Sequence, residues 1–149
     1  MNSDPKKIYF ASDQHFGIPD AASSKLREKK FISWLDEVKT DAKAIFLLGD
    51  LFDFWFEYKT VVPRGFIRVL GKIAELKDSG IPIYFFVGNH DLWMIDYFET
   101  ELGIPVYRHP KEFVFDEITG SRGKKPIMSV LNKSKLSKHE MDDLCLTEE

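Results

Sequence analysis

Three short polar stretches in the 149-residue sequence combine carboxylate, imidazole and amide side chains. They read SDQH at 12–15, GDLFD at 49–53 and GNHD at 88–91. Carboxylate, imidazole and amide groups together suit a divalent cation such as Mn, Fe, Co or Zn. None of the three stretches contains cysteine, which argues against a structural thiolate zinc site. The chemistry they indicate is therefore that of an oxygen- and nitrogen-ligated metal.

The spacing of these residues suits more than one ion. The D-x-H spacing places Asp13 and His15 on the same side of an extended segment, so both can reach one ion. Asp50 has two carboxylate oxygens and can share them between two ions. Such a pair, about 3.5–4 Å apart, generates a hydroxide nucleophile and holds the oxygens of a phosphoryl group. Gly49 and Gly88 allow tight backbone turns beside the ligands.

Each residue taken alone also has an ordinary interpretation. An aspartate after a strand is usually a turn or helix-cap residue, and His15 alone would be a hydrogen-bonded loop residue. Asp91 is either the N-cap of a helix or an acid that supports the ligands. Asp53 is either a loop residue or a second supporting acid. The combination of three motifs, each after its own apolar run, favours the metal interpretation.

The apolar runs before the motifs predict strands. They read IYFA at 8–11, AIFLL at 44–48 and IPIYFFV at 81–87, and they do not alternate with polar residues. Continuous runs of this length are typical of strands that are buried on both faces. Ligands in such sheets bind beyond the carboxyl ends of the strands. We therefore expect three loops to converge at one edge, carrying Asp13, His15, Asp50, Asn89 and His90.

Helical spacing separates the predicted strands. Apolar residues repeat at i, i+3, i+4 and i+7 over 31–38 and 66–73, and a third helix is expected from Asp91 to residue 102. A further strand is expected at 112–115. The candidate caps are Ser23 or Ser24 for the first helix, with Pro63, Gly80 and Gly103 at other helix ends. Alternation of strand and helix predicts right-handed βαβ units and an α/β fold.

Composition sets the class of protein and of partner. Twenty-one basic and 24 acidic residues give a net charge of −3, which provides no reason to expect nucleic-acid binding. The single cysteine, Cys145, fits a reducing compartment. The sequence shows neither a secretory leader nor an apolar run long enough to span a bilayer. We expect a cytoplasmic protein for which contact with a membrane surface stays open, and whose oligomeric state the sequence does not fix.

Aromatic residues stop abruptly along the chain. All 21 lie at or before Phe115, and residues 116–149 are rich in Lys, Ser and acidic residues. The expected division is a folded segment at 1–117 followed by a divergent tail at 118–149, for which disorder is one interpretation.

The segments FASDQHFG, LLGDLFDFWFEY and FFVGNHDLWM resemble the calcineurin-like metallophosphoesterases over about residues 6–117. Within that superfamily they are most similar to the UDP-2,3-diacylglucosamine hydrolases. The resemblance implies an αββα sandwich and a divalent metal pair, most commonly Mn²⁺. It also implies hydrolysis of the pyrophosphate of a nucleotide-linked lipid to UMP and lipid X, in lipid A synthesis at the inner face of the cytoplasmic membrane.

The resemblance also assigns roles to individual residues. Asp13, His15 and Asp50 would bind the first ion, and Asp50 would bridge to a second ion that Asn89 also binds. His90 would neutralise or protonate the phosphate ester.

The family pattern continues with G-H-G-D and later G-H-T-H, and neither appears in this sequence. A truncated or frameshifted reading frame is the expected reason, so that 1–117 represents the N-terminal half of the sandwich. The alternatives to the full activity are a catalytically impaired remnant and a phosphodiesterase for another substrate.

Overall fold

Four parallel strands form the central sheet of this chain. The structure, a computed structural model, describes residues 6–115 and 127–130. The strand order is β1-β2-β3-β4, so each strand neighbours the next one in the sequence. The strands are β1 (Lys7–Ala11), β2 (Ala42–Leu47), β3 (Ile83–Phe86) and β4 (Val106–Tyr107). The α/β class with a parallel sheet, predicted from the alternating pattern, is confirmed.

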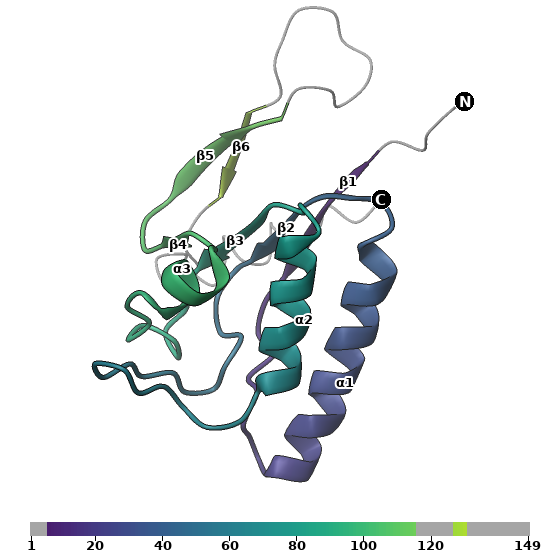
Figure 1. The fold of residues 1–149 in the computed structure, drawn as a ribbon. Helices are drawn as coiled ribbons and strands as arrows, with labels where there is room; N and C mark the ends of the chain where they lie inside the picture. Colours follow the sequence, from purple (N-terminus) through teal and green to yellow (C-terminus); the bar gives the residue numbers. More distant parts are fainter. Residues whose placement is uncertain (1–5, 116–126, 131–149) are drawn as a thin grey trace, which may run out of the picture.

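Two long helices cover one face of the sheet. They are α1 (Ala21–Val38) and α2 (Ile67–Asp78), and Figure 1 shows them lying side by side. Right-handed crossovers between strands that follow one another in order place every connecting helix on the same side of a sheet. The core beneath the helices is built from apolar side chains of both layers, among them Phe31, Leu35, Ile45, Leu47, Ile73 and Phe85.

The opposite face of the sheet is aromatic. Phe46 and Phe86 are fully buried there without a helix above them. Instead, β5 (Lys111–Val114) pairs antiparallel with β6 (Ile127–Val130) and supplies Phe113, whose ring centroid lies 4.9 Å from that of Phe46. This hairpin begins a second layer on the face that the helices leave open (Figure 1).

Three predicted helix starts were wrong. The second helix, α2, begins at Ile67 with Phe66 at its N-cap, and not at Pro63. The N-cap of α1 is Asp20, which accepts a hydrogen bond from the Ser23 N–H at 2.9 Å, because the helix begins before the serines and Ser24 turns inward. The third helix, α3 (Tyr97–Leu102), begins six residues later than expected. Asp91 does not cap it, because its carboxylate accepts the backbone N–H groups of Leu51 in the loop after β2 and of Gly88 in its own loop. Gly103 ends α3 in the left-handed conformation, as predicted.

The strand predictions were incomplete in two ways. The sequence predicted that β1 is buried on both faces. Because β1 lies at the edge of the described sheet, its Phe10 side chain is instead 46% exposed. The short strand β4 and the strand β6 were not predicted. The rest of the expected tail at 118–149 lies outside the described residues. Among the helices that the structure describes, none is both long and apolar enough to cross a membrane.

Candidate metal centre

The loops after β1 and β2 run side by side beyond the sheet. The backbone N–H of His15 donates to the carbonyl of Asp50 at 3.0 Å, and that of Phe16 donates to the carbonyl of Leu51 at the same distance. The Asp13 N–H donates to the Gly49 carbonyl at 3.2 Å. The D-x-H and GD motifs are therefore hydrogen-bonded to each other as a continuation of the β1–β2 pairing.

Three of the predicted ligands have unusual backbone conformations. The φ angles of Asp13, His15 and Asp50 are 59°, 45° and 53°, all in the left-handed region that non-glycine residues adopt uncommonly. Backbone strain of this kind clusters at active sites and ligand clamps, where surrounding contacts hold it in place. Three of the five described non-glycine residues with positive φ lie in these two adjacent loops, which makes this edge of the sheet the candidate site.

Close packing between two glycines brings the loop after β3 into the same place. Gly49 has a φ of 88°, and a Cβ added there would lie 2.6 Å from the backbone nitrogen of Gly88. A Cβ at Gly88 would lie 2.1 Å from Oδ1 of Asp50. The same Oδ1 accepts the backbone N–H of His90 at 2.9 Å. Asp50 therefore contacts both the loop after β1, through His15, and the loop after β3, through Gly88 and His90.

Ligand atoms of Asp13, His15 and Asp50 all lie within 4.8 Å of one another. Asp13 and His15 are partly exposed, whereas Asp50 is only 5% exposed. Among the described residues, Nδ1 of His15 is the buried side-chain polar atom for which no hydrogen-bond partner is found. A buried polar atom of this kind is costly unless something binds it. The donor set and this unpartnered nitrogen both fit a divalent ion.

Asp53 lies between two imidazole rings. Its Oδ1 is 3.4 Å from Nδ1 of His15 and 3.4 Å from Nδ1 of His90, and the two ring centroids are 4.7 Å apart. The His15 contact does not have hydrogen-bond geometry, which is why that nitrogen remains unpartnered. Nδ1 of His90 instead lies 2.8 Å from the backbone carbonyl of Asp53. Asp53, His15 and His90 form a second group of candidate ligand atoms beside the first.

The side chain of Asp91 links the GDLFD and GNHD motifs. Its fully buried carboxylate accepts the Gly88 N–H at 2.6 Å and the Leu51 N–H at 3.1 Å. Burial raises the pKa of this carboxyl to about 6, with the nearby Asp50 adding to the rise and the backbone N–H groups opposing it. Of the two interpretations of Asp91, the supporting acid is thus the one that its contacts favour.

Asn89 lies in the loop after β3, where it is exposed. It stands between Gly88 and His90, which both contact Asp50. The loop therefore carries Asn89 to the same edge of the sheet as Asp50.

Sequence reasoning missed two charged residues near the site. Glu57 is 5% exposed and accepts hydrogen bonds from Trp55 Nε1 at 2.9 Å and from the N–H groups of Asp96 and Tyr97 at 2.8 and 3.2 Å. A charged residue inside the aromatic run FDFWFEY was the available signal, because a buried carboxylate requires partners. The other is Arg27, whose partners are backbone carbonyls.

Comparison with known proteins gives the class of this chain. The profile of the calcineurin-like phosphoesterases matches residues 6–145, so the chain belongs to that family. The name of the family makes it one of hydrolases.

Curated relatives point to one branch of the family. The chain is 52% identical over 103 residues to a UDP-2,3-diacylglucosamine hydrolase of Porphyromonas gingivalis, covering 69% of this chain and 39% of that protein. Hydrolases of the same name match from Actinobacillus succinogenes (32% over 98 residues, 66% and 40% covered) and Vibrio cholerae (33% over 110 residues, 72% and 41% covered). The chain spans about two fifths of the length of these relatives.

Proposed function

We propose that this chain is the metal-binding part of a phosphoesterase that hydrolyses the pyrophosphate of UDP-2,3-diacylglucosamine to UMP and lipid X. The observation that carries the proposal is the convergence of Asp13, His15 and Asp50 within 4.8 Å at the ends of two strands. The names of its relatives supply the substrate. A site on the ends of parallel strands is also where an α/β sheet binds its ligands.

The residues divide into ligands and supports. Asp13, His15 and Asp50 would hold the first ion, and Asp50 and Asn89 would hold the second. When bound, a divalent pair lowers the pKa of a water molecule and neutralises the phosphoryl oxygens. Carboxylate, imidazole and amide oxygen ligands without sulfur suit Mn²⁺, which is the ion we propose.

His90 is the proposed catalytic residue. A carbonyl oxygen only accepts, so the 2.8 Å contact with the Asp53 carbonyl places a hydrogen on Nδ1 of His90. Nε2 is then the nitrogen available to a phosphate ester oxygen. As an imidazolium, His90 would neutralise the phosphate and donate the Nε2 proton to the leaving oxygen. The role of Asp53 is to hold both imidazoles, and that of Asp91 is to fix the Asp50 loop against the Asn89 loop.

Exposed aromatic side chains beside the centre suit the lipid part of such a substrate. Phe54 and Trp93 are 57% and 54% exposed, and their ring centroids lie 5.8 Å apart. Phe56 is 46% exposed and also contacts Trp93, at 6.5 Å. These three residues lie in the loops that carry Asp53 and His90, and we call them the aromatic surface. We propose that they contact acyl chains or the cytoplasmic face of the inner membrane, where aromatic side chains favour the interface.

Two alternatives are tested with the main proposal. The motifs select phosphoester chemistry without selecting the organic group, so a phosphodiesterase for another substrate is one alternative. The other is a chain that binds metal without turnover, because this sequence assigns only Asp50 and Asn89 to the second ion.

The deciding assay is UMP release from UDP-2,3-diacylglucosamine with and without Mn²⁺. It compares the native chain with Asp50→Ala, each alone and co-expressed with the C-terminal segment of the P. gingivalis relative. The proposal expects Mn²⁺-dependent release that requires Asp50, most strongly in the co-expressed pair. Hydrolysis of bis(p-nitrophenyl) phosphate without UMP release would favour another substrate. Metal binding without turnover in every combination would favour the inactive chain.

A further inference from the structure

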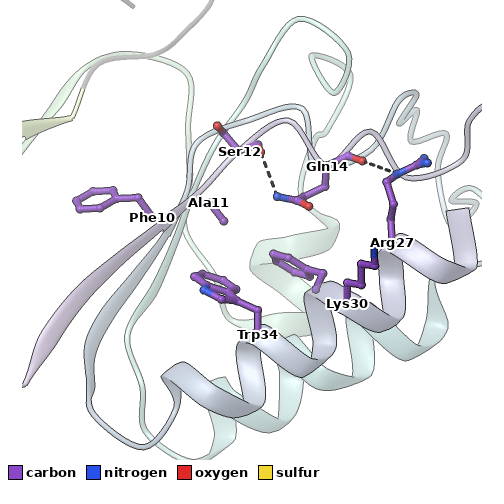
Figure 2. Close-up of a pocket in the computed structure, with 8 residues that line it drawn as sticks. Phe10, Ala11, Ser12, Gln14, Arg27, Lys30 and Trp34 are labelled. Atoms are coloured by element: carbon purple, nitrogen blue, oxygen red, sulfur yellow. Dashed lines mark hydrogen bonds between the residues drawn. The ribbon is translucent and has the colours of Figure 1, made fainter. Parts of the chain in front are cut away.

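A single guanidinium in α1 binds the loop that carries the first two ligands. Arg27 donates from Nη2 to the backbone carbonyl of His15 at 2.9 Å and from Nε to that of Gln14 at 3.3 Å. Its Nη2 also contacts the carbonyl of Ile18. Figure 2 shows Arg27 reaching from the helix to the loop, where Gln14 in turn donates to the Ser12 carbonyl. Three carbonyls of one loop therefore share one side chain.

From these contacts we infer that Arg27 is a positioning residue, which holds the Asp13–His15 segment in the backbone conformation that presents both ligands. The inference rests on the proposed metal site, and it adds a residue that the family motifs D-x-H, GD and GNHD do not contain. Arg27 acts through the backbone, and no contact between it and substrate is implied.

The loop needs such a support because β1 is an edge strand of the described sheet. On the inner side, the N–H groups of His15 and Phe16 donate to the carbonyls of Asp50 and Leu51. On the outer side, no described strand accepts or donates hydrogen bonds to the loop. Backbone groups that a neighbouring strand does not satisfy require side chains or water instead. The planar fork of an arginine offers five donors and can satisfy several carbonyls at once.

The same loop has the strained backbone. Asp13 and His15 both have positive φ angles, and such conformations persist only where surrounding contacts hold them. Fixing the carbonyl of His15 on one side and its N–H on the other leaves the His15 peptide units little freedom to rotate. This is the mechanical reason for the proposed role of Arg27.

A second contact from α1 fixes the far end of the loop. The Gly17 N–H donates to Oγ of Ser24 at 2.8 Å, and the Ser24 hydroxyl donates to Oε1 of Glu28 at 2.7 Å. Ser24 and Glu28 are both buried. Residues 24, 27 and 28 have the i, i+3, i+4 spacing of one helix face. The first two turns of α1 thus present one polar face to the loop.

The chain also offers a matched control. Arg27 and Lys30 line the same hollow of about 460 Å³ between the end of β1 and α1, together with Gln14 and Trp34 (Figure 2). Lys30 is exposed and makes none of the carbonyl contacts described for Arg27. Replacing Lys30 removes the same charge from the same helix and leaves the loop supported.

The test follows amide hydrogen exchange by NMR in the metal-free 149-residue chain. Compared are native protein, Arg27→Ala, Arg27→Lys and Lys30→Ala. In Arg27→Ala we expect exchange of the His15 and Phe16 amides to become at least about tenfold faster, because opening of the loop no longer breaks the Arg27 contacts. The Phe46 and Phe85 amides in the sheet should keep their rates. Arg27→Lys should be intermediate, since an ammonium cannot span three carbonyls, and Lys30→Ala should match the native protein.

The same proteins are then titrated with Mn²⁺. Loss of a residue that orients a ligand costs about 10–100-fold in metal affinity, and we expect a loss in this range for Arg27→Ala and a native affinity for Lys30→Ala. The inference would be overturned if the His15 and Phe16 amides exchanged at native rates in Arg27→Ala. Native rates in Arg27→Lys, the better-tolerated substitution, would overturn it as well. Faster exchange with unaltered Mn²⁺ affinity would overturn it too, by leaving Arg27 a purely structural role. A native chain that binds no Mn²⁺ would contradict the proposed function, and the exchange rates would still decide whether Arg27 holds the loop.

Discussion

The carboxylate of Asp50 accepts a hydrogen bond from the backbone N–H of His90 at 2.9 Å, so the loop after β2 is joined directly to the loop after β3. These residues lie 40 positions apart in the sequence. The loops that carry Asp50 and Asn89, two of the four metal-ligand candidates, thereby lie at one edge of the sheet. The contact also defines which substitutions should disturb the centre and which should not.

Gly88→Ala should displace the proposed bridging ligand. A Cβ at this position would lie 2.1 Å from Oδ1 of Asp50 and 2.6 Å from its backbone nitrogen, so the carboxylate must move. We expect Mn²⁺ affinity, measured by calorimetric titration, to fall by about tenfold or more.

Gly71→Ala is the control for that change. Gly71 lies within α2 and has open space around its Cα, so the added methyl should stabilise the helix by about 1 kcal/mol without affecting Mn²⁺ binding. Equal Mn²⁺ affinity of the two variants would contradict the packing of Gly88 on Asp50.

Asp91→Asn should destabilise the fold. Each carboxylate oxygen accepts one backbone N–H, from Gly88 and from Leu51, and an asparagine has only one oxygen to offer. One buried N–H would lose its acceptor, at a cost of about 1–3 kcal/mol in the free energy of unfolding, measured by urea denaturation.

Asp96→Asn provides the comparison for Asp91. Asp96 is exposed and its side chain makes no capping hydrogen bond to α3, so the free energy of unfolding should change by less than about 0.5 kcal/mol. Similar effects of the two substitutions would show that the Asp91 carboxylate does not join the two loops.

Asp36 should make stability depend on pH at the acidic end. Its Oδ1 accepts hydrogen bonds from Lys39 at 2.8 Å and from Lys72 at 3.1 Å, and these bonds lower the pKa of the Asp36 carboxyl, Lys39 more strongly. A lowered pKa means that the contribution to stability is complete above the ordinary value of 3.8 and is lost as the pH falls below it. Asp36→Asn should therefore be less stable than native protein at neutral pH, with the difference vanishing in acid.

Urea denaturation at neutral and acidic pH, each at low and high salt, measures this effect. Because Asp36 and Lys39 are partly exposed, the difference at neutral pH should shrink as salt is added. A difference that persisted at a pH below the lowered pKa would refute the ion-pair explanation.

The aromatic surface should bind lipid. Replacing both Phe54 and Trp93 with Ser should reduce sedimentation of the chain with anionic phospholipid vesicles, because the exposed rings no longer enter the interface. Leu26→Ser is the control, since Leu26 is 63% exposed but lies on α1. Both variants should keep the native free energy of unfolding. If the native chain does not bind vesicles, or if the double substitution leaves binding unchanged, the aromatic surface does not contact lipid as proposed.

Local patterns predicted the sheet and the helix faces well. The apolar runs gave β1, β2 and β3, and the i, i+3, i+4 spacing gave α1 and α2, because both signals depend only on near neighbours. The start of α3 was missed, and the sequence left the two interpretations of Asp91 open, because its partner Leu51 lies 40 positions away. The exposure of Phe10 likewise depends on the position of β1 at the sheet edge, which no local pattern encodes.

The candidate site was predicted as far as side-chain chemistry allowed. D-x-H, GD and GNHD predicted that Asp13, His15, Asp50 and Asn89 would converge as ligands, and ligand atoms of the first three lie within 4.8 Å of one another. Arg27 escaped prediction because its partners are backbone carbonyls, which any sequence possesses. The strand β6 was missed because it lies in the segment without aromatic residues, which was assigned to the tail, whereas its pairing partner β5 lies outside that segment.

The central claim is that Asp50 is the shared ligand of a divalent metal site, and Mn²⁺ titration tests it most directly. Isothermal calorimetry would compare metal-free native chain, Asp50→Ala and Asp78→Ala, the last an exposed carboxylate on α2. The prediction is saturable Mn²⁺ binding by the native chain, retained in Asp78→Ala and weakened by about 100-fold or more in Asp50→Ala. Absence of saturable binding in the native chain, or equal binding by Asp50→Ala, would contradict the account.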